Sequence, residues 1–105
     1  MIKAILRLPV GAGDLDAVVD FYTSRQVLQR ARAGAGCASA ELLVSASASE
    51  ILVTSMWSSA EAYQSWVGSS ARSEEAVELR CLLNGDLEPA EVYEVVIRAG
   101  NEVVQ

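Results

Sequence analysis

The sequence predicts one α+β domain in which helices cover one face of an antiparallel, four-stranded sheet. Apolar and polar residues alternate in four segments, two other regions carry apolar residues at helical spacing, and the order is strand, helix, strand, strand, helix, strand. A chain of 105 residues has room for one domain with one hydrophobic core. We therefore expect residues 1–105 to form a single domain.

The first half of the chain predicts a strand, a helix and a second strand. Residues 2–8 alternate between two faces, as a strand does, and residues 14–32 have helical spacing. Gly34 and Gly36 are expected to end the helix, and residues 37–46 to form the second strand. The residues at helical spacing are Leu15, Val18, Val19, Tyr22 and Gln26, and four of these five can line an inward stripe.

The second half predicts two strands around a helical region that is split in two. Residues 50–57 form the clearest strand of the chain. Ser58 and Glu61 have the spacing of a capping box, which begins a helix that continues to residue 67. A Gly-Ser-Ser segment separates it from a second helical stretch at 73–83, and residues 91–98 form the last strand. This β-α-β-β-α-β order is the ferredoxin-like arrangement.

The third and fourth predicted strands carry large apolar residues on both faces. Because the helices cover only one face of the sheet, the other face needs a second cover. A second copy of the sheet, packed about a two-fold axis, supplies it, so we expect a homodimer. A monomer with an exposed apolar patch is the alternative. The residues concerned are Ile51, Val53 and Trp57 against Leu52 and Met56, and Tyr93, Val95 and Ile97 against Val92 and Val96.

The charge and hydropathy patterns exclude several classes of partner. With 14 acidic and 8 basic side chains the net charge is −6, which repels phosphate backbones and anionic lipids, so nucleic acid is not an expected partner. No apolar run approaches the roughly 20 residues that cross a bilayer, so no membrane association is expected. The first seven residues are too short and too alternating for a signal peptide, and we expect a cytoplasmic protein.

The residue types available for chemistry are limited, because the chain contains no histidine. It therefore lacks the commonest general base, the commonest metal ligand and the commonest axial ligand of haem. Cys37 and Cys81 lack the spacing of a metal or redox motif, and we expect both to be reduced and packed. Neither a metal nor a cofactor is predicted.

Two motifs resemble the antibiotic-biosynthesis-monooxygenase family. Gly36-Cys37 precedes the second strand, and the third strand ends in Trp57-x-Ser-x-Glu61-x-Tyr63 at the start of a helix. The resemblance implies a dimeric α+β barrel with a pocket in each subunit between sheet and helices. It also implies oxidation of aromatic polyketides, such as anthrones, to quinones with O₂ and without flavin, metal or haem.

The resemblance assigns roles to particular residues. Trp57 matches the family's tryptophan at the strand end, and Tyr63 matches its pocket tyrosine, so these two are the candidate catalytic residues. The asparagine that oxygenases of the family often carry four residues before the tryptophan is Val53 here. The haem-degrading branch of the family needs a histidine, and its activity is not expected in this chain.

Physical chemistry offers two interpretations of the aromatic residues. The Trp57 ring either stacks on a flat substrate while its N–H bonds a developing oxyanion, or it fills the core. Tyr63 either donates to a phenolate or packs. Trp66, three residues later on the same helix face, and Tyr22 on the first helix either complete a flat substrate slot or form a core cluster. Trp66, Tyr22 and Val53 are therefore the candidate substrate-binding residues.

The leading functional hypothesis is a cofactor-independent monooxygenase acting on a small, hydrophobic, polycyclic aromatic or phenolic metabolite. A dry aromatic pocket with a few hydrogen-bond donors is sufficient for this chemistry, since the substrate forms its own carbanion and passes an electron to O₂. Two alternatives remain: a non-catalytic dimer that binds a small hydrophobic molecule, and a polyketide cyclase or isomerase on the same fold.

Overall fold

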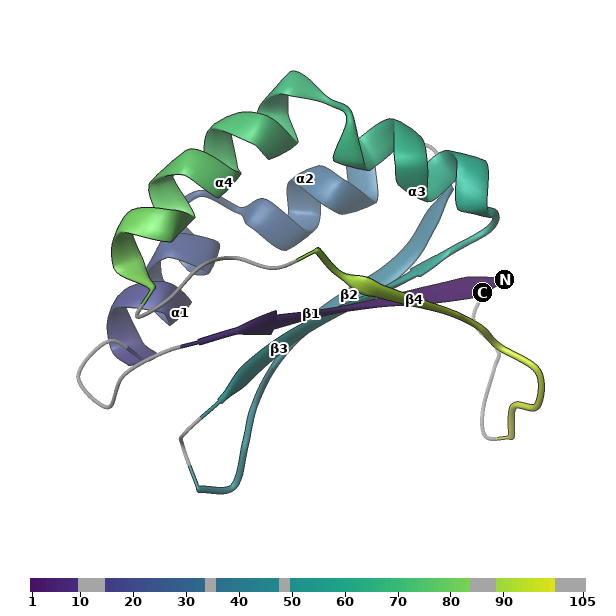
Figure 1. Ribbon diagram of the computed structural model, residues 1–105, viewed down its shortest axis with the longest axis horizontal. Coiled ribbons are helices and arrows are strands. Elements are labelled where there is room, and N and C mark those ends of the chain that lie inside the picture. The colour runs from purple at the N-terminus through teal and green to yellow at the C-terminus, as the bar shows by residue number, and fades with distance from the viewer. Residues whose placement is uncertain (10–14, 34–35, 48–49, 84–88, 100–105) are drawn as a thin grey trace.

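The computed structural model describes residues 1–9, 15–33, 36–47, 50–83 and 89–99. In this part of the chain four helices lie over a four-stranded antiparallel sheet (Figure 1). The elements in chain order are β1 (Ile2–Leu8), α1 (Leu15–Ser24), α2 (Val27–Ala33), β2 (Cys37–Val44), β3 (Ile51–Trp57), α3 (Ala60–Val67), α4 (Ser70–Leu82) and β4 (Glu91–Glu94).

The strands lie in the order β2-β3-β1-β4, and each is antiparallel to its neighbours. β1 pairs with β3 along its whole length, from Ile2 opposite Trp57 to Leu8 opposite Ile51. This strand order, combined with two helical crossovers, is the ferredoxin-like α+β fold. The predicted fold class is therefore confirmed.

All four helices cover the same face of the sheet, as Figure 1 shows, and no described helix covers the other face. The uncovered face carries a shallow hollow that is apolar except for two basic residues; its lining consists of Ile5, Met56, Tyr93, Val95 and Ile97 with Lys3 and Arg98. α4, the longest described helix, has 13 residues, and no described helix is both long and apolar enough to cross a bilayer.

The helix predicted over residues 14–32 is two helices, so this prediction is wrong in its continuity. Gln26, which lies between α1 and α2, has a φ of 52° and thus occupies the left-handed region. The chain turns there, and α2 places Val27 and Ala31 in the core, whereas Gln26 itself is exposed. No Gly or Pro marks this turn in the sequence. Residues other than Gly rarely adopt the left-handed conformation, and here a glutamine adopts it.

Two predicted strand ends extend too far. Val44 ends β2 opposite Ile51, and the Ser45 N–H then donates to the Glu50 carbonyl at 3.0 Å as the connection to β3 begins. β4 ends at Glu94 rather than at residue 98, because Glu94 already lies opposite Ile2, the first residue of β1. The chain beyond it therefore has little of β1 left to pair with.

The helix starts also differ from prediction by one to three residues. Ser59, not Ser58, is the N-cap of α3, and its hydroxyl accepts the Ala62 N–H at 3.1 Å. The capping box predicted from Ser58 and Glu61 is therefore wrong by one residue. α4 begins at Ser70 instead of residue 73, because the Ser69 hydroxyl caps it by accepting a backbone N–H at 3.2 Å.

Candidate functional site

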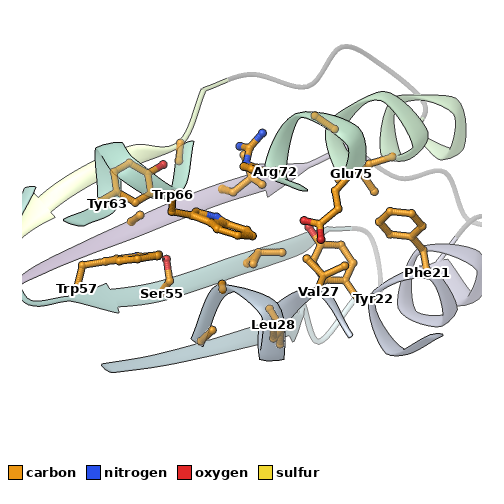
Figure 2. A pocket seen from close by; sticks show the side chains of 18 residues that line it. Phe21, Tyr22, Val27, Leu28, Ser55, Trp57, Tyr63, Trp66, Arg72 and Glu75 are labelled. Carbon is orange, nitrogen blue, oxygen red and sulfur yellow. The ribbon is translucent and has the colours of Figure 1, made fainter. Parts of the chain in front are cut away.

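A cavity lies between the sheet and the helices, at the boundary between two hydrophobic clusters. One cluster includes Leu8 and Ile51 at one end of the central strands, and the other includes Trp57 and Tyr63 at the opposite end. The cavity between them encloses about 70 Å³ (Figure 2). This volume holds a few water molecules and is smaller than the roughly 300–1,000 Å³ of typical ligand pockets.

Small side chains create this cavity. Ala40, Ser55 and Ala4 lie opposite one another on β2, β3 and β1, so their side chains form one row on the helix-covered face. All three line the cavity, as do Ala31 of α2 and Ala76 of α4. Because short side chains meet here from both layers, the sheet and the helices leave space that larger residues fill on either side.

All five residues predicted to form the site line this cavity. Tyr22 comes from α1, Val53 and Trp57 from β3, and Tyr63 and Trp66 from α3. Figure 2 shows Trp57 and Trp66 with their ring planes along the sheet, and Tyr22 at the far end of the cavity. Val53 contributes an apolar side chain to the wall of the cavity.

Trp57 is fixed by its surroundings at the end of β3. It is 1% exposed, and its ring meets the Tyr63 ring edge to face at 5.6 Å between centroids. Its indole N–H donates to the Ser55 Oγ at 2.7 Å, so this donor is already occupied by the protein. The Ser55 hydroxyl accepts that bond and keeps its own proton, which is a donor available to a ligand in the cavity.

Gly36 packs against the turn from β3 to α3, the segment that carries Trp57 and Tyr63. Its φ is +92°, and a Cβ added to it would lie 2.5 Å from the Ala62 Cβ and 2.9 Å from the Ser58 Oγ. Its carbonyl accepts the Ser58 N–H at 2.8 Å. The start of β2 is thus in close contact with the first turn of α3, which explains why glycine precedes Cys37.

Both tyrosines of the cavity stay protonated in neutral water. Burial raises the pKa of Tyr63, and the nearby Arg72 guanidinium only partly opposes this effect. Burial also raises the pKa of Tyr22, with Arg72 lowering it and the Glu75 carboxylate raising it further. Each phenol is therefore a hydrogen-bond donor and not a base.

Sequence reasoning missed two charged residues of α4 that line the cavity, Arg72 and Glu75. Figure 2 shows the Arg72 guanidinium at the edge of the cavity away from the sheet, and the Glu75 carboxylate pointing toward Tyr22. The Glu75 side chain is 6% exposed, and its Oε2 lies 3.0 Å from the Arg30 Nη1. Burial raises the pKa of Glu75, while Arg30, Arg72 and Arg25 lower it.

A signal for these residues exists in the helical spacing of α4. Arg72, Glu75, Ala76 and Leu79 follow one another at intervals of three, one and three residues, which places them on one face of the helix. Ala76 and Leu79 are buried, so that face points into the protein. A charged residue on an apolar face was the available clue.

No group of three or more His, Cys, Asp or Glu side chains able to hold a metal ion occurs among the described residues. The two cysteines are free thiols on different elements. Cys37 is buried, as predicted, and burial raises its pKa. Cys81 is exposed on α4, so the expectation that it packs in the core is wrong.

Solved structures of several proteins share this fold over nearly the whole chain. Rv0793 from Mycobacterium tuberculosis is 20% identical, with a TM-score of 0.79 over 94% of this chain and 98% of that one. A candidate antibiotic biosynthesis monooxygenase from Deinococcus radiodurans is 17% identical, with a TM-score of 0.78 over 96% and 98%. The ActVA-Orf6 monooxygenase of Streptomyces coelicolor, in complex with nanaomycin D, is 25% identical, with a TM-score of 0.68 over 95% and 89%.

The sequence matches no curated protein. The antibiotic biosynthesis monooxygenase family does match it, over residues 1–77, which extend from β1 into α4 and include Tyr22, Val53, Trp57, Tyr63 and Trp66. The chain belongs to the antibiotic biosynthesis monooxygenase family.

Proposed function

We propose that this protein is a cofactor-independent monooxygenase that oxidises a polycyclic aromatic or phenolic metabolite with O₂. The observation that supports the proposal is the convergence of Trp57, Tyr63, Trp66 and Tyr22 on one apolar cavity. The cavity also holds hydrogen-bond donors, the hydroxyls of Tyr63 and Ser55, that suit a substrate with developing negative charge on oxygen. The ActVA-Orf6 monooxygenase, solved with nanaomycin D, is consistent with a small-molecule ligand.

A polycyclic substrate requires Trp66 to move, since the cavity encloses only about 70 Å³. Trp66 is half-buried and also lines an outer hollow of about 390 Å³, together with Gly36, Glu61 and Ser65. Trp57 borders both spaces as well. We propose that rotation of the Trp66 side chain joins the hollow to the cavity and admits the substrate.

Catalysis in this proposal depends on orientation and on exclusion of water. The fixed Trp57 ring provides a flat surface on which the substrate stacks, and Tyr63 donates a hydrogen bond to the substrate oxygen as charge develops. Ser55, whose oxygen accepts the Trp57 N–H, offers a second donor from the floor of the cavity.

A second copy of the chain is proposed to cover the open face of the sheet. Tyr93 is 50% exposed and Ile97 is 89% exposed, and with Ile5 and Met56 they line the hollow of that face. An Ile97→Asp variant is expected to be a monomer in light scattering after size-exclusion chromatography, whereas the wild type is a dimer. A monomeric wild type at micromolar concentration would contradict the proposal.

A polyketide cyclase or isomerase is the second candidate. Val53 favours it, because an apolar side chain at this position offers no hydrogen bond to the substrate oxygen that an oxygenase must polarise. A cyclase or isomerase transfers protons without consuming O₂, so oxygen uptake separates the two activities.

The experiment is aerobic incubation of metal-stripped protein with a simple anthrone, following quinone absorbance and O₂ uptake together. Wild-type turnover is expected to exceed the protein-free rate and to fall at least about tenfold in Trp57→Phe and in Tyr63→Phe. Tyr93→Phe makes the same chemical change on the opposite face and serves as the control. Oxygen uptake equal to the protein-free rate contradicts the oxygenase, and product formation without uptake favours the isomerase.

A further inference from the structure

Glu75 is a buried carboxylate in the wall of the substrate cavity. It projects from α4, its side chain is 6% exposed, and Figure 2 shows the carboxylate directed at Tyr22, which also lines the cavity. Carboxylates are rarely buried, because removal from water costs several kcal/mol unless ion pairs and hydrogen bonds replace the lost hydration. The carboxylate therefore needs a compensating partner or a function.

The protein satisfies this carboxylate only in part. Arg30 Nη1 approaches Glu75 Oε2 to 3.0 Å, which makes an ion pair between α2 and α4. The same oxygen accepts no hydrogen bond from any residue that the structure describes. The carboxylate of a residue that lines the cavity, paired with one guanidinium and otherwise without hydrogen bonds at Oε2, retains unused capacity to accept a proton.

A second ion pair on α4 joins this helix to its neighbours at the surface, in contrast to the buried pair of Glu75 and Arg30. Glu78, one turn further along α4, binds Arg25 through both of its oxygens, and both side chains are nearly half exposed. That pair joins α4 to the end of α1 without burying charge. Glu75 does not need to be buried to tie α4 to its neighbours, so its place in the cavity calls for another explanation.

We propose that Glu75 is the general base that removes a proton from the bound substrate. The inference rests on the proposed function, and it adds the residue that acts on a substrate with an acidic C–H in the ring system of an aryl ketone, as in an anthrone. Such a carbon acid is uncharged when it enters an apolar cavity. It becomes an anion only when the carboxylate at the wall accepts the proton.

The reaction balances with O₂ as the only co-reactant. Glu75 breaks the C–H bond of the methylene by taking its proton, and the electron pair remains on the substrate as a carbanion. The carbanion reduces O₂ and forms a C–O bond, and the resulting peroxide anion takes the proton back from Glu75. The carboxylate then removes the second hydrogen of that carbon as a proton, the C–H electron pair forms the ketone C=O bond, and the O–O bond breaks to release hydroxide. The hydroxide takes the proton from Glu75, so that water and a ketone leave and the carboxylate is restored.

The charged groups around Glu75 suit this role. Burial raises the pKa of Glu75, which brings a carboxylate closer to the operating pH of a general base. Arg30 from α2, Arg72 from its own helix and Arg25 from the segment between α1 and α2 oppose the effect, and Glu74 adds to it. Tyr22 of α1 faces the carboxylate as an uncharged phenol, since its pKa is itself raised.

Hydrogen–deuterium exchange without oxygen tests the base separately from the oxygenase. Anthrone is incubated anaerobically in D₂O with the full-length protein, and deuterium in its methylene is measured by mass spectrometry. The wild-type protein is expected to exchange the methylene hydrogens faster than buffer alone does. In Glu75→Gln the protein-catalysed exchange rate is expected to fall at least about a hundredfold. Glu78→Gln changes the same functional group on the same helix outside the cavity and is expected to match wild type.

Two further measurements exclude a merely structural effect. Urea unfolding of Glu75→Gln establishes that the variant is folded under the assay conditions. Glu75→Asp keeps the carboxylate but shortens its reach, so it is expected to retain more exchange than the glutamine variant. The wild-type exchange rate is expected to rise with pH and level off above the pKa of Glu75, and this step is expected to be absent in Glu75→Gln.

Each outcome separates this proposal from the oxygenase. Glu75→Gln exchanging within threefold of wild type overturns the base, whatever the oxygen uptake. Oxygen uptake by a wild type that does not accelerate exchange overturns the base and leaves the oxygenase. Exchange that depends on Glu75 without aerobic oxygen uptake supports the base and overturns the oxygenase. A wild type with neither activity on anthrone overturns both.

Discussion

Replacing Gly36 by alanine tests whether the contact between β2 and α3 holds the aromatic segment in place. The alanine Cβ would lie 2.5 Å from the Ala62 Cβ, and the backbone would have to keep a φ of +92°. The left-handed conformation costs an L-residue roughly 1–2 kcal/mol, and overpacking adds about 1–3 kcal/mol. We expect Gly36→Ala to lower the free energy of unfolding by about 2–5 kcal/mol.

The assay is urea unfolding followed by tryptophan fluorescence, at one fixed protein concentration because dimerisation would shift the midpoint. Gly68→Ala is the matched control. Gly68 has a φ of −84°, and its added Cβ would meet only the Gln64 carbonyl oxygen at an ordinary 3.5 Å. We expect this variant within about 1 kcal/mol of wild type. A Gly36→Ala variant equally close to wild type would refute the reasoning.

Four further substitutions test other contacts. Ser55→Ala leaves the buried Trp57 N–H without its acceptor, so we expect the free energy of unfolding to fall by about 1–3 kcal/mol in urea titrations. Trp66→Leu removes the side chain between cavity and outer hollow, and calorimetry should record tighter anthrone binding. Gln26→Gly relieves a left-handed residue and should stabilise the fold by about 0.5–1 kcal/mol. Since burial raises the folded pKa of Glu75 above its ordinary 4.5, the stability of wild type relative to Glu75→Gln should decline as pH rises from 4.5 through that pKa.

Each of these has an outcome that would count against it. An unchanged midpoint in Ser55→Ala would mean that water or a rearranged ring satisfies the indole. Weaker anthrone binding by Trp66→Leu would indicate that the tryptophan holds the ligand and does not block it. A destabilised Gln26→Gly would show that the side chain stabilises the turn. A pH-independent difference between wild type and Glu75→Gln would contradict the raised pKa.

The sequence by itself determined the fold and the aromatic part of the site. Alternation in the strands and apolar spacing in the helices depend on local geometry, and their order specifies the ferredoxin-like sheet. Trp57, Tyr63 and Trp66 lie within ten residues of one another, across one strand-to-helix turn. Their convergence follows from that turn, and so it was visible in the sequence.

The positions of Arg72 and Glu75 in the cavity wall, and the bend at Gln26, became known only from the tertiary structure. Arg72 and Glu75 on a helix normally face water, and whether they do depends on how α4 lies over the sheet. That position depends in turn on small residues distant in the chain, Ala4 and Ala40, which leave space beneath the helix. The spacing of Arg72 and Glu75 with Ala76 and Leu79 marks a common helix face, but what that face meets depends on residues brought together from separate elements.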